Sequence, residues 1–92
     1  MTIPYNPPKG VRSPIEDSVF RRVLVGALTE VQGIKAARAA VRLIAAGLLK
    51  GDVETSGGRP FRVYALRINP LNVPPELRLH VPQEATPPRT VA

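Results

Sequence analysis

The sequence predicts a small α+β domain in which two or three helices precede a two-stranded β-hairpin. Apolar residues recur at the 3.6-residue helical period along residues 14–31 and again along residues 34–49. β-branched and aromatic residues then flank a Ser-Gly-Gly turn sequence, which is typical of a hairpin. Prolines crowd both ends of the chain, where they oppose helix formation. We therefore expect a folded domain at residues 13–68, a flexible proline-rich arm at residues 1–12 and a mostly flexible proline-rich extension at residues 69–92.

Composition limits the partners that the protein can have. Thirteen Lys and Arg residues against seven Asp and Glu give a formal charge of +6, which favours nucleic acid ahead of an acidic protein or a membrane surface. The absence of cysteine excludes disulfides and a cysteine zinc site. No apolar run reaches the roughly 18 residues of a membrane span, and the first residues lack the form of a signal peptide. We therefore expect a cytoplasmic protein with no membrane contact.

The small size of the folded unit and the basic end of the arm before it both bear on what the protein binds. A domain of about 60 residues buries only about 60% of its unfolded surface and is marginally stable alone, so we expect a homodimer. Residues 1–12 end in Lys9-Gly10-Val11-Arg12. They are either a disordered terminus or a basic arm that touches a DNA backbone or a neighbouring subunit.

The first helix has a clear start signal. Ser13 suits the N-cap, Pro14 suits the first helical position, and Glu16 is spaced to bond back to the cap amide. We expect this helix to run from Pro14 to about Leu28–Glu30, with Gly26 as a weak point inside it. Its apolar stripe comprises Ile15, Val19, Phe20, Val23, Leu24, Ala27, Leu28 and Val31.

The second helix is predicted at residues 34–49, after a turn at Thr29–Gly33 in which Gly33 takes a left-handed conformation. Its expected core face comprises Ile34, Ala37, Ala40, Val41, Ile44 and Leu48. Another face carries three basic residues spaced three and four apart, flanked by small alanines; these are Lys35, Arg38 and Arg42, with Ala39 and Ala46. No acid occurs between Val31 and Gly51, so no acid on this segment neutralises the stripe. The alternative is a solvated polar face with alanines that favour helix formation.

The hairpin is predicted from residues 52–55, a turn at 56–58, and a return strand at 61–68. Strict alternation puts Arg62, Tyr64, Leu66 and Ile68 on one side of the return strand and Phe61, Val63, Ala65 and Arg67 on the other.

Residues 34–68 resemble the winged helix-turn-helix transcription regulators. The resemblance lies in AVRLIAAGLLKGDVETSGGRPFRVYAL, with its GLL exit from the helix, GGRP tip and VYAL return strand. It implies that the helix at 34–49 enters the major groove and that the wing at 56–60 contacts backbone or minor groove. The implied DNA-binding residues are Lys35, Arg38, Ala39, Arg42, Lys50, Arg59 and Arg62.

The resemblance implies a sequence-specific double-stranded DNA-binding protein, a nucleoid-associated transcription regulator of the repressor type. The family usually has three helices before the wing, whereas this sequence provides two. Either Thr29–Ile34 contains a very short middle helix, or the unit is trimmed and completed by a dimer partner. The alternative function is a winged-helix protein–protein interaction module in a replication or other nucleoprotein assembly.

Catalysis is not expected. His80 is the only histidine, and no nucleophile, base and orienting residue group together. Asp52 and Glu54 share a side of a strand but fit wing charges better than an acid–base pair. We expect no metal and no small-molecule cofactor.

Overall fold

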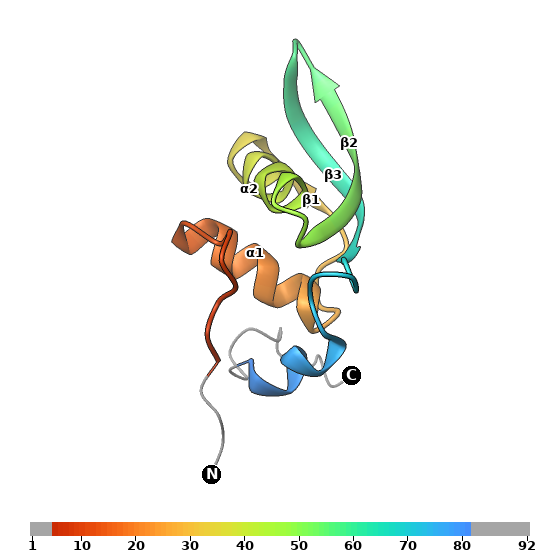
Figure 1. The fold of residues 1–92 in the computed structure, drawn as a ribbon. Coiled ribbons are helices and arrows are strands. Elements are labelled where there is room, and N and C mark those ends of the chain that lie inside the picture. Colours follow the sequence, from red (N-terminus) through yellow and green to blue (C-terminus); the bar gives the residue numbers. More distant parts are fainter. Residues whose placement is uncertain (1–4, 82–92) are drawn as a thin grey trace, which may run out of the picture.

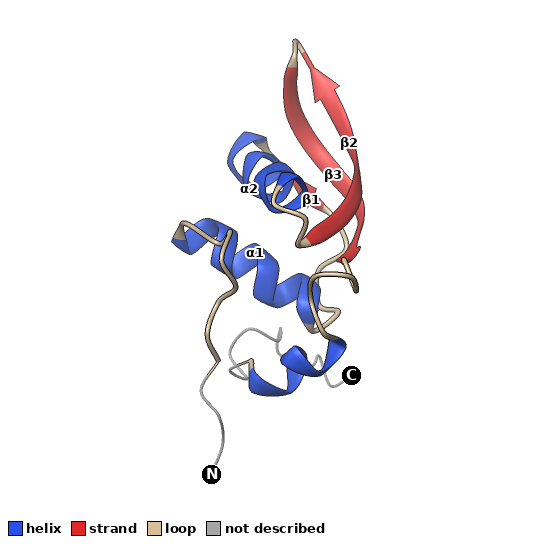
Figure 2. Cartoon of the chain, in the orientation of Figure 1, coloured by secondary structure: helices blue, strands red, loops and turns tan. Residues whose placement is uncertain are grey.

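The computed structural model describes residues 5–81 and confirms the α+β class. The element order is α1 (Pro14–Leu24), β1 (Val31–Gln32), α2 (Ile34–Ala45), β2 (Leu49–Ser56), β3 (Arg59–Ile68) and the 3-10 helix η1 (Pro75–His80) (Figure 1). The strands form one antiparallel sheet in the order β1-β3-β2, so the sheet has three strands and not the predicted two (Figure 2). Expectations for residues 1–4 and 82–92 lie outside the described residues.

Both α-helices begin where the sequence predicts and end about four residues early. α1 ends at Leu24 and α2 at Ala45. Two residues later, Gly26 and Gly47 take positive φ angles of +75° and +80°. The N–H of each glycine and of the residue after it bond back to carbonyls in the last helical turn, as in the Schellman motif. Gly26 is therefore the stop signal of α1 and not a weak point inside it.

The segment between the helices contains a strand where the sequence predicted a turn or a short middle helix. Val31 and Gln32 pair with Val63 and Arg62 of β3. The Leu66 N–H donates to the Thr29 carbonyl at 2.9 Å, which extends this edge of the sheet. No helix lies between residues 25 and 33. The backbone of this connection hydrogen-bonds to β3 and does not form a helical turn, so the middle-helix alternative is wrong.

The predicted alternation along β3 fails at a bulge. Val63 and Leu66 are both buried although they are three residues apart. Ala65 between them has a φ of +54°, and the register with β2 shifts beside Gly51. A β-carbon on Gly51 would lie 3.0 Å from Leu66 Cδ2 and 3.1 Å from the Tyr64 carbonyl oxygen. The bulge therefore brings Leu66 into the core beside Gly51, where a β-carbon would be tightly crowded.

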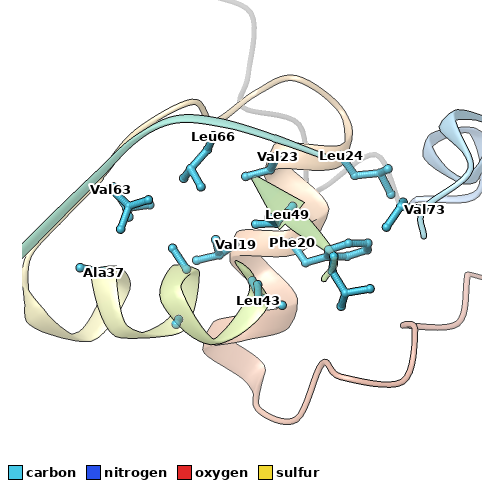
Figure 3. Close-up of a cluster of buried hydrophobic side chains, with 14 residues drawn as sticks. Val19, Phe20, Val23, Leu24, Ala37, Leu43, Leu49, Val63, Leu66 and Val73 are labelled. Carbon is cyan, nitrogen blue, oxygen red and sulfur yellow. The ribbon is translucent and has the colours of Figure 1, made fainter. Parts of the chain in front are cut away.

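The core lies between α1, α2 and the sheet, and within residues 5–81 it contains 14 buried apolar side chains (Figure 3). Its largest fully buried members are Phe20, Leu43, Leu49, Val63 and Val73. The α2 core face is rotated from the predicted one, because Leu43 is fully buried whereas Ile34 is 46% exposed.

The core extends beyond the predicted domain limits of residues 13–68. Val73 is buried, and Tyr5, Val11 and Leu77 pack against the same cluster. In Figure 1, η1 lies beside α1. The segments flanking residues 13–68 thus close the core, so a missing helix is no longer an argument for a dimer.

The bulge yields a paired prediction. Gly51→Ala should lower the free energy of unfolding by about 1–3 kcal/mol, because the added methyl group overlaps Leu66 and the Tyr64 carbonyl. Ala65→Gly should raise it by up to about 1 kcal/mol, because glycine tolerates the positive φ angle. Urea unfolding of both variants and the native chain measures these changes. A neutral Gly51→Ala together with a destabilising Ala65→Gly would contradict the bulge geometry.

Candidate nucleic-acid interface

The exposed side of α2 carries the basic stripe that the sequence predicts. Lys35, Arg38 and Arg42 are all exposed, and the first turn of α2 contains no acid. Within residues 5–81, neither Lys35 nor Arg38 takes part in an ion pair. The three side chains line one hollow of about 260 Å³, which Ile15 and Glu16 of α1 close on the other side. Three of the six charged residues that are predicted to bind DNA therefore share one surface.

Ala39 is buried beneath this stripe and does not flank it on the surface. Its residue exposure is 5%, and it belongs to the hydrophobic core. Ala39 lies one helical turn before Leu43, which is fully buried, so both point towards α1 and the sheet. Ala39 therefore exposes little surface for the contact that the sequence predicts, and it forms part of the floor of the hollow.

An acid from another element approaches the stripe, which the sequence did not predict. Glu16 is only 3% exposed, and its Oε2 lies 3.7 Å from Arg42 Nη1. Its carboxylate also accepts hydrogen bonds from Ser13 Oγ at 3.1 Å and from the Arg12 N–H at 3.4 Å. The Ser13 hydroxyl in turn accepts from the Glu16 N–H at 3.2 Å, so the predicted Ser13 cap is confirmed. Glu16 thus joins the start of α1, the arm and α2.

Arg62 is held within a cluster of its own and does not extend the stripe. Its guanidinium pairs with Glu30 at 2.8 Å and with Glu54, and it stacks over the Tyr64 ring with 4.5 Å to the centroid. Hydrogen bonds from Arg62 and then from Gln32 lower the pKa of Glu30. The hydrogen bond with Glu30 is also the main cause that raises the pKa of Arg62. Arg62, which the sequence predicts to bind DNA, is therefore already paired with two carboxylates.

Strand register separates Lys50 and Arg62 from the α2 surface. Lys50 lies opposite Arg67 in the strand register. Each is adjacent in sequence to one member of the Leu49–Ile68 pair, whose side chains face the core. Arg62 likewise neighbours the buried Val63, so Lys50 and Arg62 lie on the sheet face that points away from α2.

Arg59 lies at the hairpin tip, paired with Ser56 across the Gly57-Gly58 turn, as the sequence predicts. It is exposed, and within the described residues it makes no ion pair. Figure 1 shows this tip projecting beyond the helices. Arg59 is therefore available for contact at the far end of the molecule from α1.

No family model, curated protein or solved structure matches this chain. Among residues 5–81, no helix is long and apolar enough to cross a membrane. The same part of the chain contains no group of three or more His, Cys, Asp or Glu side chains that could hold a metal ion. The geometry of the basic surface is the remaining indication of function.

The buried carboxylate yields a stability prediction. Glu16→Gln should lower the free energy of unfolding by about 1–2 kcal/mol, because the amide loses charge-assisted bonds and the favourable interaction with the α1 N-terminus. Thermal or urea unfolding measures the loss. Glu76→Gln is the matched control, because Glu76 is an exposed acid in the first turn of η1 and should change stability by less than about 0.5 kcal/mol. Equal effects in both variants would contradict the structural role of Glu16.

Proposed function

We propose that this protein is a small sequence-specific double-stranded DNA-binding protein of the winged helix-turn-helix type, acting as a transcription regulator of the repressor type. The observation that carries the proposal is the exposed basic side of α2. Lys35, Arg38 and Arg42 project from a helix without acids, and that helix leads directly into a projecting hairpin with Arg59 at its tip.

The dimensions of α2 suit the major groove. Its 12 residues span about 18 Å at 1.5 Å per residue. The major groove is about 12 Å wide and admits one α-helix. The exposed side of α2 continues past Arg42 into Ala45 and Ala46, whose small side chains allow a close approach. Arginine can form two hydrogen bonds to guanine or grip a phosphate, and lysine can contact either group.

The wing would make the second contact. The turn at Gly57-Gly58 brings Arg59 to the tip of the β2–β3 hairpin, where it can reach the backbone or the minor groove. Lys50 and Arg62 are left out of this proposed interface, because they lie on the opposite face of the sheet and Arg62 already binds two carboxylates.

A homodimer is part of the proposal because one short recognition helix reaches few base pairs. Two copies of α2 about 34 Å apart on a two-fold axis would enter successive major grooves. The mass of the complex with a duplex, measured by light scattering, gives the stoichiometry. Two chains per specific site support the dimer, and one chain per site would contradict it.

The proposed surface is tested by charge removal. Arg38→Ala and Arg42→Ala should each weaken binding to a pool of random-sequence duplexes about tenfold in low salt, because each removes a contact to phosphate or base. Each should also reduce the slope of log affinity against log salt by about 0.9 if its contact is to phosphate. Fluorescence anisotropy at several salt concentrations measures both quantities.

Arg67→Ala is the matched control, because it removes an exposed arginine from the sheet face that points away from α2. It should leave duplex affinity within about twofold. Unchanged affinity in both Arg38→Ala and Arg42→Ala, with the fold intact, would reject DNA binding through α2. The protein–protein alternative would then remain.

A further inference from the structure

A second hollow adjoins the basic stripe at the C-terminal end of α2. It has a volume of about 540 Å³ and is lined by the arm, the start of α1 and the end of α2. The lining residues are Gly10, Arg12, Glu16, Arg42, Ala45 and Ala46. Glu16 and Arg42 also line the hollow beside Lys35 and Arg38, so the two hollows form one continuous surface.

The arm holds Arg12 in this position through contacts on both sides of it. A β-carbon on Gly10 would lie 3.1 Å from Ala46 Cβ and 3.3 Å from Leu48 Cδ1, so the arm backbone approaches the end of α2 closely. Val11 packs against the hydrophobic core. The Arg12 N–H donates to Glu16 Oε1 at 3.4 Å. The Arg12 backbone is therefore fixed against the domain while its side chain is exposed.

We propose that Arg12 and Arg42 together bind one phosphate group of a nucleic-acid backbone at the C-terminal end of α2. The inference rests on the proposed function and adds Arg12 to the DNA surface. Two guanidinium groups supply a fork of donors that matches phosphate oxygens. The small, exposed side chains of Ala45 and Ala46 leave the hollow beside Arg12 and Arg42 open to the sugar–phosphate chain.

Glu16 also lines the hollow, and its charge opposes an incoming phosphate. That carboxylate is already bonded to Ser13 Oγ and to the Arg12 N–H, which satisfies part of its hydrogen-bonding capacity. The Arg42 side chain is 71% exposed and lies 3.7 Å from Glu16, so the pair is loose and its guanidinium is open to solvent. Arg42 can therefore contact a phosphate while Glu16 retains its other two partners.

An open hollow continuous with the stripe favours a backbone phosphate over a free anion. Two guanidinium groups can hold either source of phosphate, but a phosphate within a strand can also contact the adjoining stripe, which a free anion is too small to reach. This path runs from Arg12 past Arg42 towards Arg38 and Lys35. The site would thus fix the register of α2 without contributing base specificity.

The test is the salt dependence of duplex binding by Arg12→Gln, which retains the backbone bond to Glu16. The slope of log affinity against log salt should fall by about 0.9, and affinity near 0.15 M salt should fall about fivefold. Arg22→Gln is the matched control, because it removes an exposed arginine from the last turn of α1, away from the hollow. Arg12→Lys should recover most of the slope. Thermal unfolding of each variant checks that the fold is retained.

The results distinguish failure of the proposed Arg12 phosphate site from failure of DNA binding as a whole. If Arg38→Ala weakens duplex binding while Arg12→Gln matches Arg22→Gln, DNA binding stands and the Arg12 site is rejected. If none of these variants changes duplex binding, both proposals fail. A titration with inorganic phosphate, followed by the NMR signals around Arg12, identifies the source. Saturation by free phosphate, with no effect of Arg12→Gln on duplex affinity, would overturn the backbone assignment.

Discussion

The buried carboxylate of Glu16 is the interaction on which the arrangement of the basic surface depends. A buried charge is costly unless it is paired and hydrogen-bonded, and here the partners come from three segments. Ser13 belongs to the start of α1, the Arg12 N–H belongs to the arm, and Arg42 belongs to α2. One side chain therefore contacts the start of α1, the arm and the basic stripe of α2. That side chain also reduces the positive potential of the stripe, so stability and anion binding oppose each other at this point.

A second constraint sets the two faces of the sheet apart. Gly51 and Ala65 form a bulge that turns Leu66 into the core, and the register then directs Arg62 outward to Glu30 and Glu54. On the outer face Arg62 is held by two carboxylates, whereas Lys35 and Arg38 on α2 make no ion pair within residues 5–81. The charge of +6 indicates an anionic partner for the whole chain, but only this division by face indicates where such a partner would bind.

Local signals in the sequence were sufficient for the helix starts and the hairpin turn. Ser13-Pro14 and Gly57-Gly58 determine backbone geometry through their own chemistry, so their neighbourhoods could be predicted. The helix ends were missed although Gly26 carried a usable signal. The two-residue β1 is too short to leave a periodic pattern. Two tertiary contacts could not be predicted, because local periodicity carries no information about them. They are the pairing of Arg62 with Glu30, 32 residues earlier, and the approach of Glu16 to Arg42.

The central claim is that the exposed side of α2 contacts duplex DNA. The most direct measurement is an NMR titration of the isotopically labelled protein with a short duplex, in which backbone amide shifts map the contact surface. Shifts should concentrate on residues 34–46, around residues 10–12 and at the hairpin tip, with little change around Arg62 and Tyr64 on the outer sheet face. Shifts concentrated on that outer face, or no shifts at low salt, would contradict the account.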